Sequence, residues 1–415
     1  MRVKYGKLLM YGFSLFFSFS ALASDKKQRK TVFVIVDGIA YDMLAKTATP
    51  NIDYIAAKGS LIPAYIGGKK DSYSQTPTIS AVGYNSLLTG TWVNKHNVWD
   101  NGIADPNYNY PTLFRLIKDQ KPELKTAVFS TWEDNRTKLI GEGLTETNQI
   151  KMDYAFDGLE LDEFRYPHDN NSEYIKEVDN AVVHRASEYI AKYAPDLSWV
   201  YLQYTDDMGH RYGDGKKLYE GITFEDELIG KLYKAIEYRE KNFDEEWLFV
   251  VTTDHGRTET DGKHHGGQSD RERSVWILSN QAEWIANTNK FTPSVVDIAP
   301  SIADFMKLDI PIETKREWDG NSMFDNVEVE GLTAEVKGSK LNVYWNYNAS
   351  VGSRSAEIWL ATTNHVKSGG KDEYILLGKA DLSKEKASFK VKKSETGFYK
   401  IFLKSEVGNL NTWIL

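Results

Sequence analysis

Short apolar runs alternate with helical patterns over the first three quarters of the chain. Residues 31–36 (TVFVIV) are almost wholly apolar and rich in β-branched side chains, which is typical of a strand buried on both faces of a parallel sheet. The other predicted strands are 125–130, 198–203, 247–252 and 274–278, and the predicted helices are 51–58, the stretch that ends at Gly90, 172–193 and 224–239. This order predicts an α/β domain with a mostly parallel sheet sandwiched by helices. The polar segment 133–171 is expected to be an irregular surface excursion.

The pattern changes after Asn326. Seven short runs of alternating apolar and polar residues follow, separated by turns rich in Gly, Ser, Asn or Lys. Such spacing predicts a β-sandwich module of the fibronectin III or immunoglobulin type over 326–415, next to a catalytic domain over 24–325. The alternative is a set of extra strands added to the catalytic sheet.

The N-terminus has the pattern of an export signal. Residues 1–7 are basic, residues 8–20 are apolar, and 21–23 has the A-x-A form of a signal-peptidase site. We therefore expect a signal peptide over 1–23, a mature chain that starts near Ser24, and a periplasmic or secreted protein. A buried N-terminal helix is the alternative. No other run approaches the length of a membrane span, and the chain has no Cys, so no disulfide can form.

The charge balance limits the possible partners. The formal net charge is -8 over 415 residues, which argues against non-specific binding to duplex nucleic acid or to anionic membranes. The hydrophobic share of 41% indicates a folded protein.

Chemically active side chains follow the predicted strands. The four clusters are Asp37 after 31–36, Ser80 at the start of the helix that ends at Gly90, Asp206 and His210 after 198–203, and Asp254 and His255 after 247–252, with His264 and His265 close behind. Ligands of open α/β sheets bind at the carboxyl ends of strands. Four of the eight histidines lie in the last two clusters, and core packing does not explain that concentration. The clusters therefore predict a metal site.

The candidates form a set that suits two divalent ions. It consists of the hydroxyl of Ser80, the carboxylates of Asp37, Asp206 and Asp254, and the imidazoles of His210, His255 and one of His264 and His265. Without cations these carboxylates would repel one another. The share of histidine favours zinc, with manganese as the alternative. Taken singly, Asp37-Gly38 is also a common turn, Ser80 also fits a helix N-cap, and Asp207 competes with Asp206.

The ordered motifs resemble the alkaline phosphatase superfamily, and within it the nucleotide pyrophosphatase/phosphodiesterase branch. They are VDG at Asp37, TPNIDYIAAKGS over 49–60, the segment that ends in LLTG, DDMGH over 206–210, and TTDHG over 252–256. The resemblance implies that Ser80 is the nucleophile, because the family's Ser or Thr lies nine residues before the Thr of the pair Thr89-Gly90. It implies one metal held by Asp206, His210 and His265, and another held by Asp37, Asp254, His255 and Ser80. It also implies that Asn101 donates to a phosphoryl oxygen.

Two differences from the branch argue against a nucleotide substrate. Ala81 follows Ser80 where the branch commonly has an aromatic residue that stacks on the base, and only nine residues separate His255 from His265. Tyr201 offers another stacking face, although a strand Tyr is more often part of the packing. The segment from Ser80 lacks the Pro and Arg of the sulfatase signature, so a sulfatase is not expected.

The sequence thus predicts an exported two-metal phosphohydrolase that acts on small phosphate esters through a phosphoseryl intermediate. Asn101 favours a phosphodiesterase of the nucleotide pyrophosphatase type. The first alternative is a phosphomonoesterase in which Arg257, Arg271 or Arg273 binds the charged phosphoryl oxygens. The second is a non-catalytic metal-binding module whose sandwich contacts a glycan or a protein.

Overall fold

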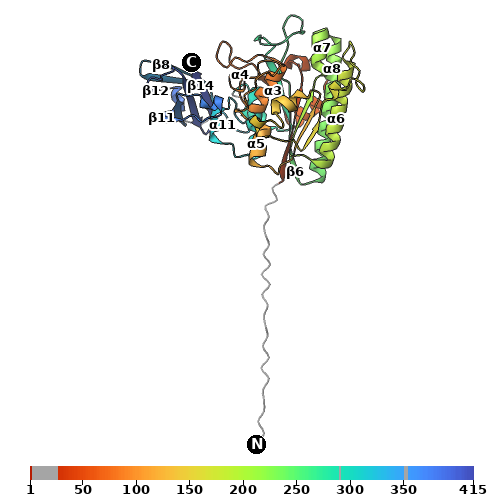
Figure 1. The fold of residues 1–415 in the computed structure, drawn as a ribbon, viewed down its shortest axis with the longest axis horizontal. Helices are drawn as coiled ribbons and strands as arrows, with labels where there is room; N and C mark the ends of the chain where they lie inside the picture. Colours follow the sequence, from red (N-terminus) through yellow and green to blue (C-terminus); the bar gives the residue numbers. More distant parts are fainter. Residues whose placement is uncertain (2–26, 289–290, 350–353) are drawn as a thin grey trace.

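In a computed structural model, the described part of the chain comprises residues 27–288, 291–349 and 354–415, together with Met1. Apart from Met1, the predicted signal peptide lies outside the described residues. No helix among the described residues is both long and apolar enough to cross a lipid bilayer. Figure 1 shows a sheet covered by helices and, beside it, a separate β-structure formed by the C-terminal residues.

A seven-stranded sheet forms the centre of the N-terminal part. Its strands are β1 (Gln28–Val36), β2 (Ser60–Tyr65), β3 (Thr126–Ser130), β4 (Tyr154–Phe156), β5 (Leu197–Leu202), β6 (Glu245–Thr252) and β7 (Ser274–Ser279). Their order is β2-β7-β6-β1-β5-β3-β4. The five strands from β6 to β4 are parallel, whereas β7 runs antiparallel to both β6 and β2. The predicted mostly parallel sheet is confirmed.

Helices cover both faces of this sheet. They are α1 (Tyr41–Leu44), α2 (Pro50–Lys58), α3 (Ser80–Thr89), α4 (Val93–His96), α5 (Leu113–Gln120), α6 (Glu173–Tyr193), α7 (Tyr204–Tyr212), α8 (Lys216–Asn242), α9 (Glu283–Asn287), α10 (Ile298–Phe305) and α11 (Ile312–Glu317). Side chains of β1 alternate between two cores. Phe33 and Ile35 pack with α3, α5 and α10, whereas Val32, Val34 and Val36 pack with α2, α6 and α8. The uniformly apolar run of β1 is thereby explained, because both of its faces are buried.

The segment 133–171 is less irregular than expected. It contains a π-helix over Asn135–Ile140, two 3-10 turns (Thr145–Thr147 and Leu159–Leu161) and strand β4, which pairs with β3 at the edge of the sheet. A three-residue strand is too short to produce a period in the sequence.

The C-terminal residues form two antiparallel sheets. The strands are β8 (Val329–Lys337), β9 (Lys340–Tyr347), β10 (Ser355–Ala361), β11 (Ile375–Asp381), β12 (Lys386–Lys390), β13 (Tyr399–Ser405) and β14 (Gly408–Ile414). One sheet has the order β11-β10-β13-β14 and the other β12-β9-β8, and their inner faces enclose one apolar core. The all-β module is confirmed, and the alternative of extra strands on the catalytic sheet is wrong.

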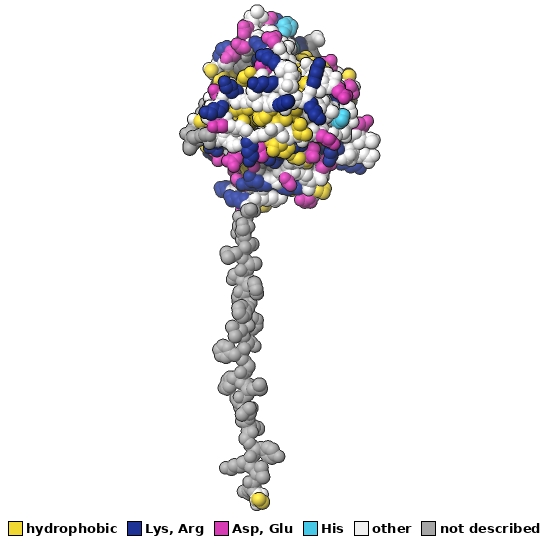
Figure 2. Space-filling view, turned by 90° about the vertical axis from the view of Figure 1, so that its left-hand side faces the viewer, with side chains coloured by type: hydrophobic (Ala, Val, Ile, Leu, Met, Phe, Trp, Pro, Cys, Tyr) yellow, Lys and Arg dark blue, Asp and Glu magenta, His cyan; other side chains and the backbone are white. Residues whose placement is uncertain are grey.

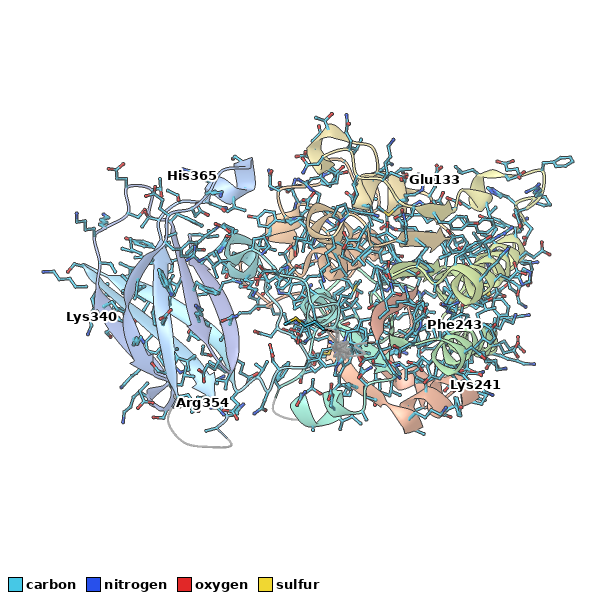
Figure 3. The ribbon with its side chains drawn as sticks, turned by 90° about the horizontal axis from the view of Figure 1, so that it is seen from below. Glu133, Lys241, Phe243, Lys340, Arg354 and His365 are labelled. Carbon is cyan, nitrogen blue, oxygen red and sulfur yellow. The ribbon has the colours of Figure 1, made fainter. Side chains whose placement is uncertain are left out.

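The β-module is attached to the N-terminal part by specific contacts. The rings of Tyr73 and Trp413 stack with centroids 5.4 Å apart, and the backbone N–H of Trp413 donates to Tyr73 Oη at 2.9 Å. The buried ammonium of Lys95 binds Asp319 at 2.6 Å and Asn411 at 3.0 Å. Figure 3 shows the β-module, with Lys340, Arg354 and His365 labelled, beside the helices and sheet of the N-terminal part.

The outer side of the β-module carries a patch of hydrophobic side chains bordered by Lys and Arg (Figure 2). Ile375 and Leu376 on β11 are among the module's exposed apolar residues, at 59% and 47%. Lys386 and Lys390 are exposed on β12, a strand at the edge of its sheet. Lysines at such a position oppose pairing with another strand, which explains their presence without a ligand.

Candidate active site

The sequence-predicted site residues meet at the carboxyl ends of the parallel strands. Asp37 follows β1, Asp254 and His255 follow β6, and Asp206 lies in the first turn of α7, just after β5. Ser80 is the first residue of α3 and is buried, with Ile79 as the N-cap residue. Ser80 is therefore not itself the N-cap of this helix.

Three oxygen atoms surround Nε2 of His255. It lies 3.3 Å from Ser80 Oγ, 3.3 Å from Asp37 Oδ1 and 3.2 Å from Asp254 Oδ2. The Nδ1–H of His255 donates to the carbonyl oxygen of Gly256 at 2.9 Å, which leaves Nε2 free as a ligand. The two carboxylate oxygens are buried and accept no hydrogen bond from any described group.

These separations fit a metal ion. Ligands bound to zinc at about 2.0–2.2 Å in a tetrahedron lie roughly 3.3–3.5 Å from one another. A buried cation also satisfies the two carboxylate oxygens that protein groups leave unsatisfied. Asp37, Asp254 and His255 therefore have the donor set and spacing of a metal site.

A second group lies alongside. Nε2 of His210 is 3.3 Å from Asp206 Oδ2 and 3.0 Å from His265 Nε2. The Nδ1–H of His265 donates to the Thr78 carbonyl at 2.8 Å, so its Nε2 is also free. Asp206, His255 and His265 place ligand atoms within 4.8 Å of one another, and this geometry suits a second ion.

The neighbouring candidates do not enter these two groups. The ring of His264 lies with its centroid 6.5 Å from that of His210, against 4.9 Å for His265. Asp207 accepts hydrogen bonds from Ser172 Oγ at 3.1 Å and Gln203 Nε2 at 3.0 Å. The geometry therefore favours His265 over His264, and Asp206 over Asp207.

The pKa values of the site residues reflect crowded acidic groups. Burial and the nearby charge of Asp37 raise the pKa of Asp254 well above its usual range. Burial lowers the pKa of His255, but the carboxylates of Asp254 and Asp37 outweigh it and raise the value to about 9. Burial and the charge of His255 lower the pKa of His265 to about 4. Positive charge at this point is thus strongly favoured.

Two buried phenols hold the first carboxylate. The hydroxyls of Tyr84 and Tyr201 both donate to Asp37 Oδ2, the latter at 2.8 Å. This arrangement leaves Oδ1 for the metal, as outer hydrogen bonds to metal ligands commonly do. Tyr201 is only 2% exposed, so it belongs to the packing and offers no stacking face. Sequence reasoning did not single out Tyr84, although its position one turn after Ser80 puts both residues on one face of α3.

Asn101 lies at the start of the same helix. Its Oδ1 accepts the backbone N–H of Ala81 at 3.0 Å, which fixes the amide one residue from Ser80. Its Nδ2 remains the donor end of the side chain. The phosphoryl contact that the resemblance implies for Asn101 stays a prediction.

The three arginines proposed as phosphate ligands are engaged by protein groups. Arg257 is completely buried and binds Gly38 and Asp206. Arg271 forms ion pairs with Asp42 and Asp214. Arg273 donates to the carbonyl oxygens of Ile66 and Gly68. These contacts do not support the expectation that one of the three binds the phosphoryl group.

Comparison with known proteins identifies the family. The family described as Type I phosphodiesterase / nucleotide pyrophosphatase matches residues 31–379. The chain belongs to this family. The resemblance inferred from the ordered motifs is confirmed, and the match continues past residue 325 into β11 of the β-module.

Individual relatives are distant. The chain is 23% identical over 265 residues to human ectonucleotide pyrophosphatase/phosphodiesterase family member 7. The aligned region covers 57% of this chain and 50% of that protein. It therefore spans about half the length of this curated relative. The structure is similar to the phosphonate monoester hydrolase of Agrobacterium radiobacter, with a TM-score of 0.51, 13% identity, and coverage of 93% of this chain and 88% of that one. A 2-O GAG sulfatase gives a TM-score of 0.50 at 11% identity, with 86% of each chain covered. At such low identity these likenesses bear on the fold alone.

Proposed function

We propose that this protein is a metal-dependent phosphodiesterase that cleaves small phosphate esters through a phosphoseryl intermediate. The observation that carries the proposal is the position of Ser80 Oγ, which lies 3.3 Å from His255 Nε2 within a shell formed by Asp37 and Asp254. A serine at the start of a helix, beside unsatisfied carboxylates and a free imidazole nitrogen, has the surroundings of an activated nucleophile. Membership of the phosphodiesterase family supports this assignment.

The residues present fit two ions. Asp37, Asp254, His255 and Ser80 would hold one, and Asp206, His210 and His265 would hold the other. We propose zinc because three of the ligands are imidazoles, with manganese as the alternative. Such ions supply positive charge that lowers the pKa of the serine hydroxyl and of water and that offsets charge on the phosphoryl oxygens.

The proposed reaction has two steps, which are assigned to Ser80, Asn101 and water. Ser80 gives up its proton to solvent and its Oγ attacks phosphorus in line, so that the Oγ–P bond forms as the bond to the leaving alcohol breaks. The departing oxygen takes a proton from solvent. Asn101 Nδ2 donates to a nonbridging oxygen. Water then attacks the phosphoserine, which releases the phosphate monoester and restores the Ser80 hydroxyl.

Preference for a diester is the finer part of the proposal. A phosphate monoester brings a second negative charge, which in this type of enzyme calls for a further cation in the pocket. Arg257, Arg271 and Arg273 are all engaged by other groups, whereas Asn101 offers an uncharged donor. This distribution favours a substrate with one negative charge at phosphorus.

The test compares kcat/KM for bis-p-nitrophenyl phosphate and p-nitrophenyl phosphate with the zinc-loaded protein. We expect the diester to be preferred by at least about tenfold, which corresponds to about 1.4 kcal/mol of transition-state stabilisation. Preference for the monoester would replace the proposal with a phosphomonoesterase. Inactivity on both substrates, with metal bound, would favour a non-catalytic metal-binding module.

We further propose that the protein is exported through the signal peptide over 1–23 and acts in the periplasm or after secretion. N-terminal sequencing of protein recovered from the periplasm or the medium tests this, with Ser24 as the expected first residue. We retain 24–325 and 326–415 as the domains. The contacts of Tyr73 and Lys95 with β14 support a bracing role for the β-module in preference to glycan or protein binding.

A further inference from the structure

A completely buried arginine lies behind the second group of candidate ligands. Arg257 follows Asp254 and His255 in the chain, and its guanidinium makes three hydrogen bonds. Nε donates to the Gly38 carbonyl at 2.8 Å, and Nη2 donates to the Asp206 carbonyl at 3.0 Å and to Asp206 Oδ1 at 2.6 Å. We propose that Arg257 is a positioning residue, which fixes the carboxylate of Asp206 so that Oδ2 faces His210 as a metal ligand. This inference rests on the proposed two-metal function.

Two glycines make room for this side chain. A Cβ atom at Gly209 would lie 2.0 Å from Arg257 Cζ, and one at Gly38 would lie 2.4 Å from Nη2. No side chain fits at such distances unless the guanidinium moves. Gly38 and Gly209 belong to two of the sequence motifs, VDG and DDMGH, and Arg257 directly follows a third, TTDHG. The space that holds the guanidinium is therefore bordered by the loop after β1, by helix α7 and by the loop after β6.

The two carboxylate oxygens of Asp206 have different nearest partners. Oδ1 accepts a hydrogen bond from the charged Nη2 at 2.6 Å and lies 3.9 Å from His265 Nε2, while Oδ2 lies 3.3 Å from His210 Nε2. Arg257 Nη2 binds both the side-chain Oδ1 and the backbone carbonyl of Asp206. The carboxylate of Asp206 therefore has little freedom to rotate. His210 needs such a rigid partner, because its own side chain is 45% exposed.

A direct role for Arg257 in binding phosphate does not fit the contacts. The side chain has no exposed surface, and Nε and Nη2 are both committed to protein oxygens. Lysine would keep the charge, but it cannot reproduce three hydrogen bonds from a planar fork. The orienting function and the charge can therefore be separated by substitution.

The experiment measures metal binding by the full chain, with zinc titrated against a chelator of known affinity. Cobalt(II) absorption spectra report the ligand geometry of each site. For Arg257→Lys and Arg257→Met we expect one of two sites to bind zinc about 10–100-fold more weakly, the usual effect of removing an outer partner of a metal ligand. We also expect the cobalt spectrum of that site to change while the other site is preserved.

Gly209→Ala provides a test that leaves Arg257 in the sequence. Its new Cβ should displace the guanidinium and reproduce the weaker site. Gly221→Ala is the matched control, because this helical glycine is also buried and its Cβ would meet ordinary contacts at 3.5 Å or more. If Arg257→Lys and Gly209→Ala bind both ions within threefold of the unsubstituted protein, the inference is wrong. If the unsubstituted protein binds no divalent ion, the proposed function itself fails and this inference fails with it.

Discussion

Ser80 Oγ lies 3.3 Å from His255 Nε2, although the two residues are 175 positions apart in the chain. Ser80 opens α3 and His255 follows β6, so the contact exists only when the helix packs over the end of the sheet. The same imidazole nitrogen contacts Asp37 and Asp254. The proposed nucleophile and the proposed metal ligands are thus brought together by the packing of α3 on the sheet. Substitutions can test their roles separately.

Replacement of Ser80 by Ala should abolish turnover and leave metal binding largely intact. The nucleophile would be lost, while Asp37, Asp254 and His255 would still present three ligand atoms. We expect kcat to fall by at least about 10³-fold, measured on the chromogenic diester, with zinc content determined in parallel. Ser86→Ala in the same helix is the control and should retain activity. An active Ser80→Ala protein would contradict the assignment.

Replacement of Asp254 by Asn should remove one of two ions. The amide keeps the shape of the side chain, but it removes a negative charge from a buried site whose Oδ2 has no other described partner. We expect bound zinc to fall from two ions toward one per chain, with activity lost. Asp261→Asn, at an exposed position on the loop after β6, should bind both. Unchanged zinc content in Asp254→Asn would remove Asp254 from the ligand set.

Zinc should stabilise the fold. Asp37, Asp206 and Asp254 converge at the carboxyl ends of the parallel strands, and cations relieve their mutual repulsion. At a free zinc concentration of 100 times Kd the expected gain per site is about 2.7 kcal/mol, seen as a higher Tm in a thermal unfolding scan. Treatment with EDTA should reverse the gain. A Tm unaffected by chelation and reloading would argue against a resident ion.

The buried carboxyl groups of Asp179 in α6 and Glu225 in α8 should make the free energy of unfolding depend on pH. Burial raises the pKa of Asp179, and burial together with the charge of Asp179 raises that of Glu225 well above its usual range. The folded protein therefore binds protons more tightly than the unfolded chain. The stability that these protons contribute is complete below about pH 4 and is lost as the pH rises through the raised pKa values.

Glu225→Gln should flatten that profile. Between pH 5 and pH 8 the unsubstituted protein should lose about 1.4 kcal/mol of stability, relative to Glu225→Gln, for each pH unit of that interval that lies below the raised pKa. Urea unfolding at the two pH values measures the difference. Glu227→Gln, on the exposed side of α8, should leave the profile unchanged. A parallel shift at both pH values would show that the pair does not titrate as described.

Removal of the Trp413 ring should weaken the link between the β-module and the nucleophile segment. Tyr73, which stacks on Trp413, lies seven residues before Ser80, and the intervening carbonyls of Thr76 and Thr78 accept from Gln268 and His265. For Trp413→Ala we expect a loss of about 2–3 kcal/mol, below the range for a fully buried Trp, and a severalfold lower kcat. Tyr344→Ala on the exposed face of the module should change neither. A normal kcat in a destabilised Trp413→Ala protein would show that the contact between Tyr73 and Trp413 stabilises the fold but does not affect turnover.

The sequence was most informative where apolar residues form a clear run that ends in a chemically active side chain. The apolar run over 31–36 predicted a buried strand, and the prediction succeeded because each face of the strand packs in a separate core. Asp37 was assigned to the site because it follows the end of that strand. Strand β2 was missed because Pro63 interrupts its pattern. Pro63 is tolerated there because β2 is an edge strand, which pairs only with β7.

The supporting contacts could not be predicted in the same way. Arg257 meets Gly38, 219 positions away, and no local pattern encodes that distance. Residue type and spacing alone left His264 and His265 equivalent, because adjacent histidines give the same signal, and the family resemblance was needed to favour His265. Tyr84 is the exception, since its helical spacing from Ser80 was visible.

The central position of β1 bears on how the chain folds. Its neighbours β5 and β6 begin near residues 197 and 245, so the first strand to be made has no partner until most of the N-terminal part has been synthesised. Loops of that length close slowly, and unpaired apolar strands associate with other chains in the meantime. A chain of this order suits a route in which it is kept unfolded until complete, and its yield on refolding should fall steeply with protein concentration.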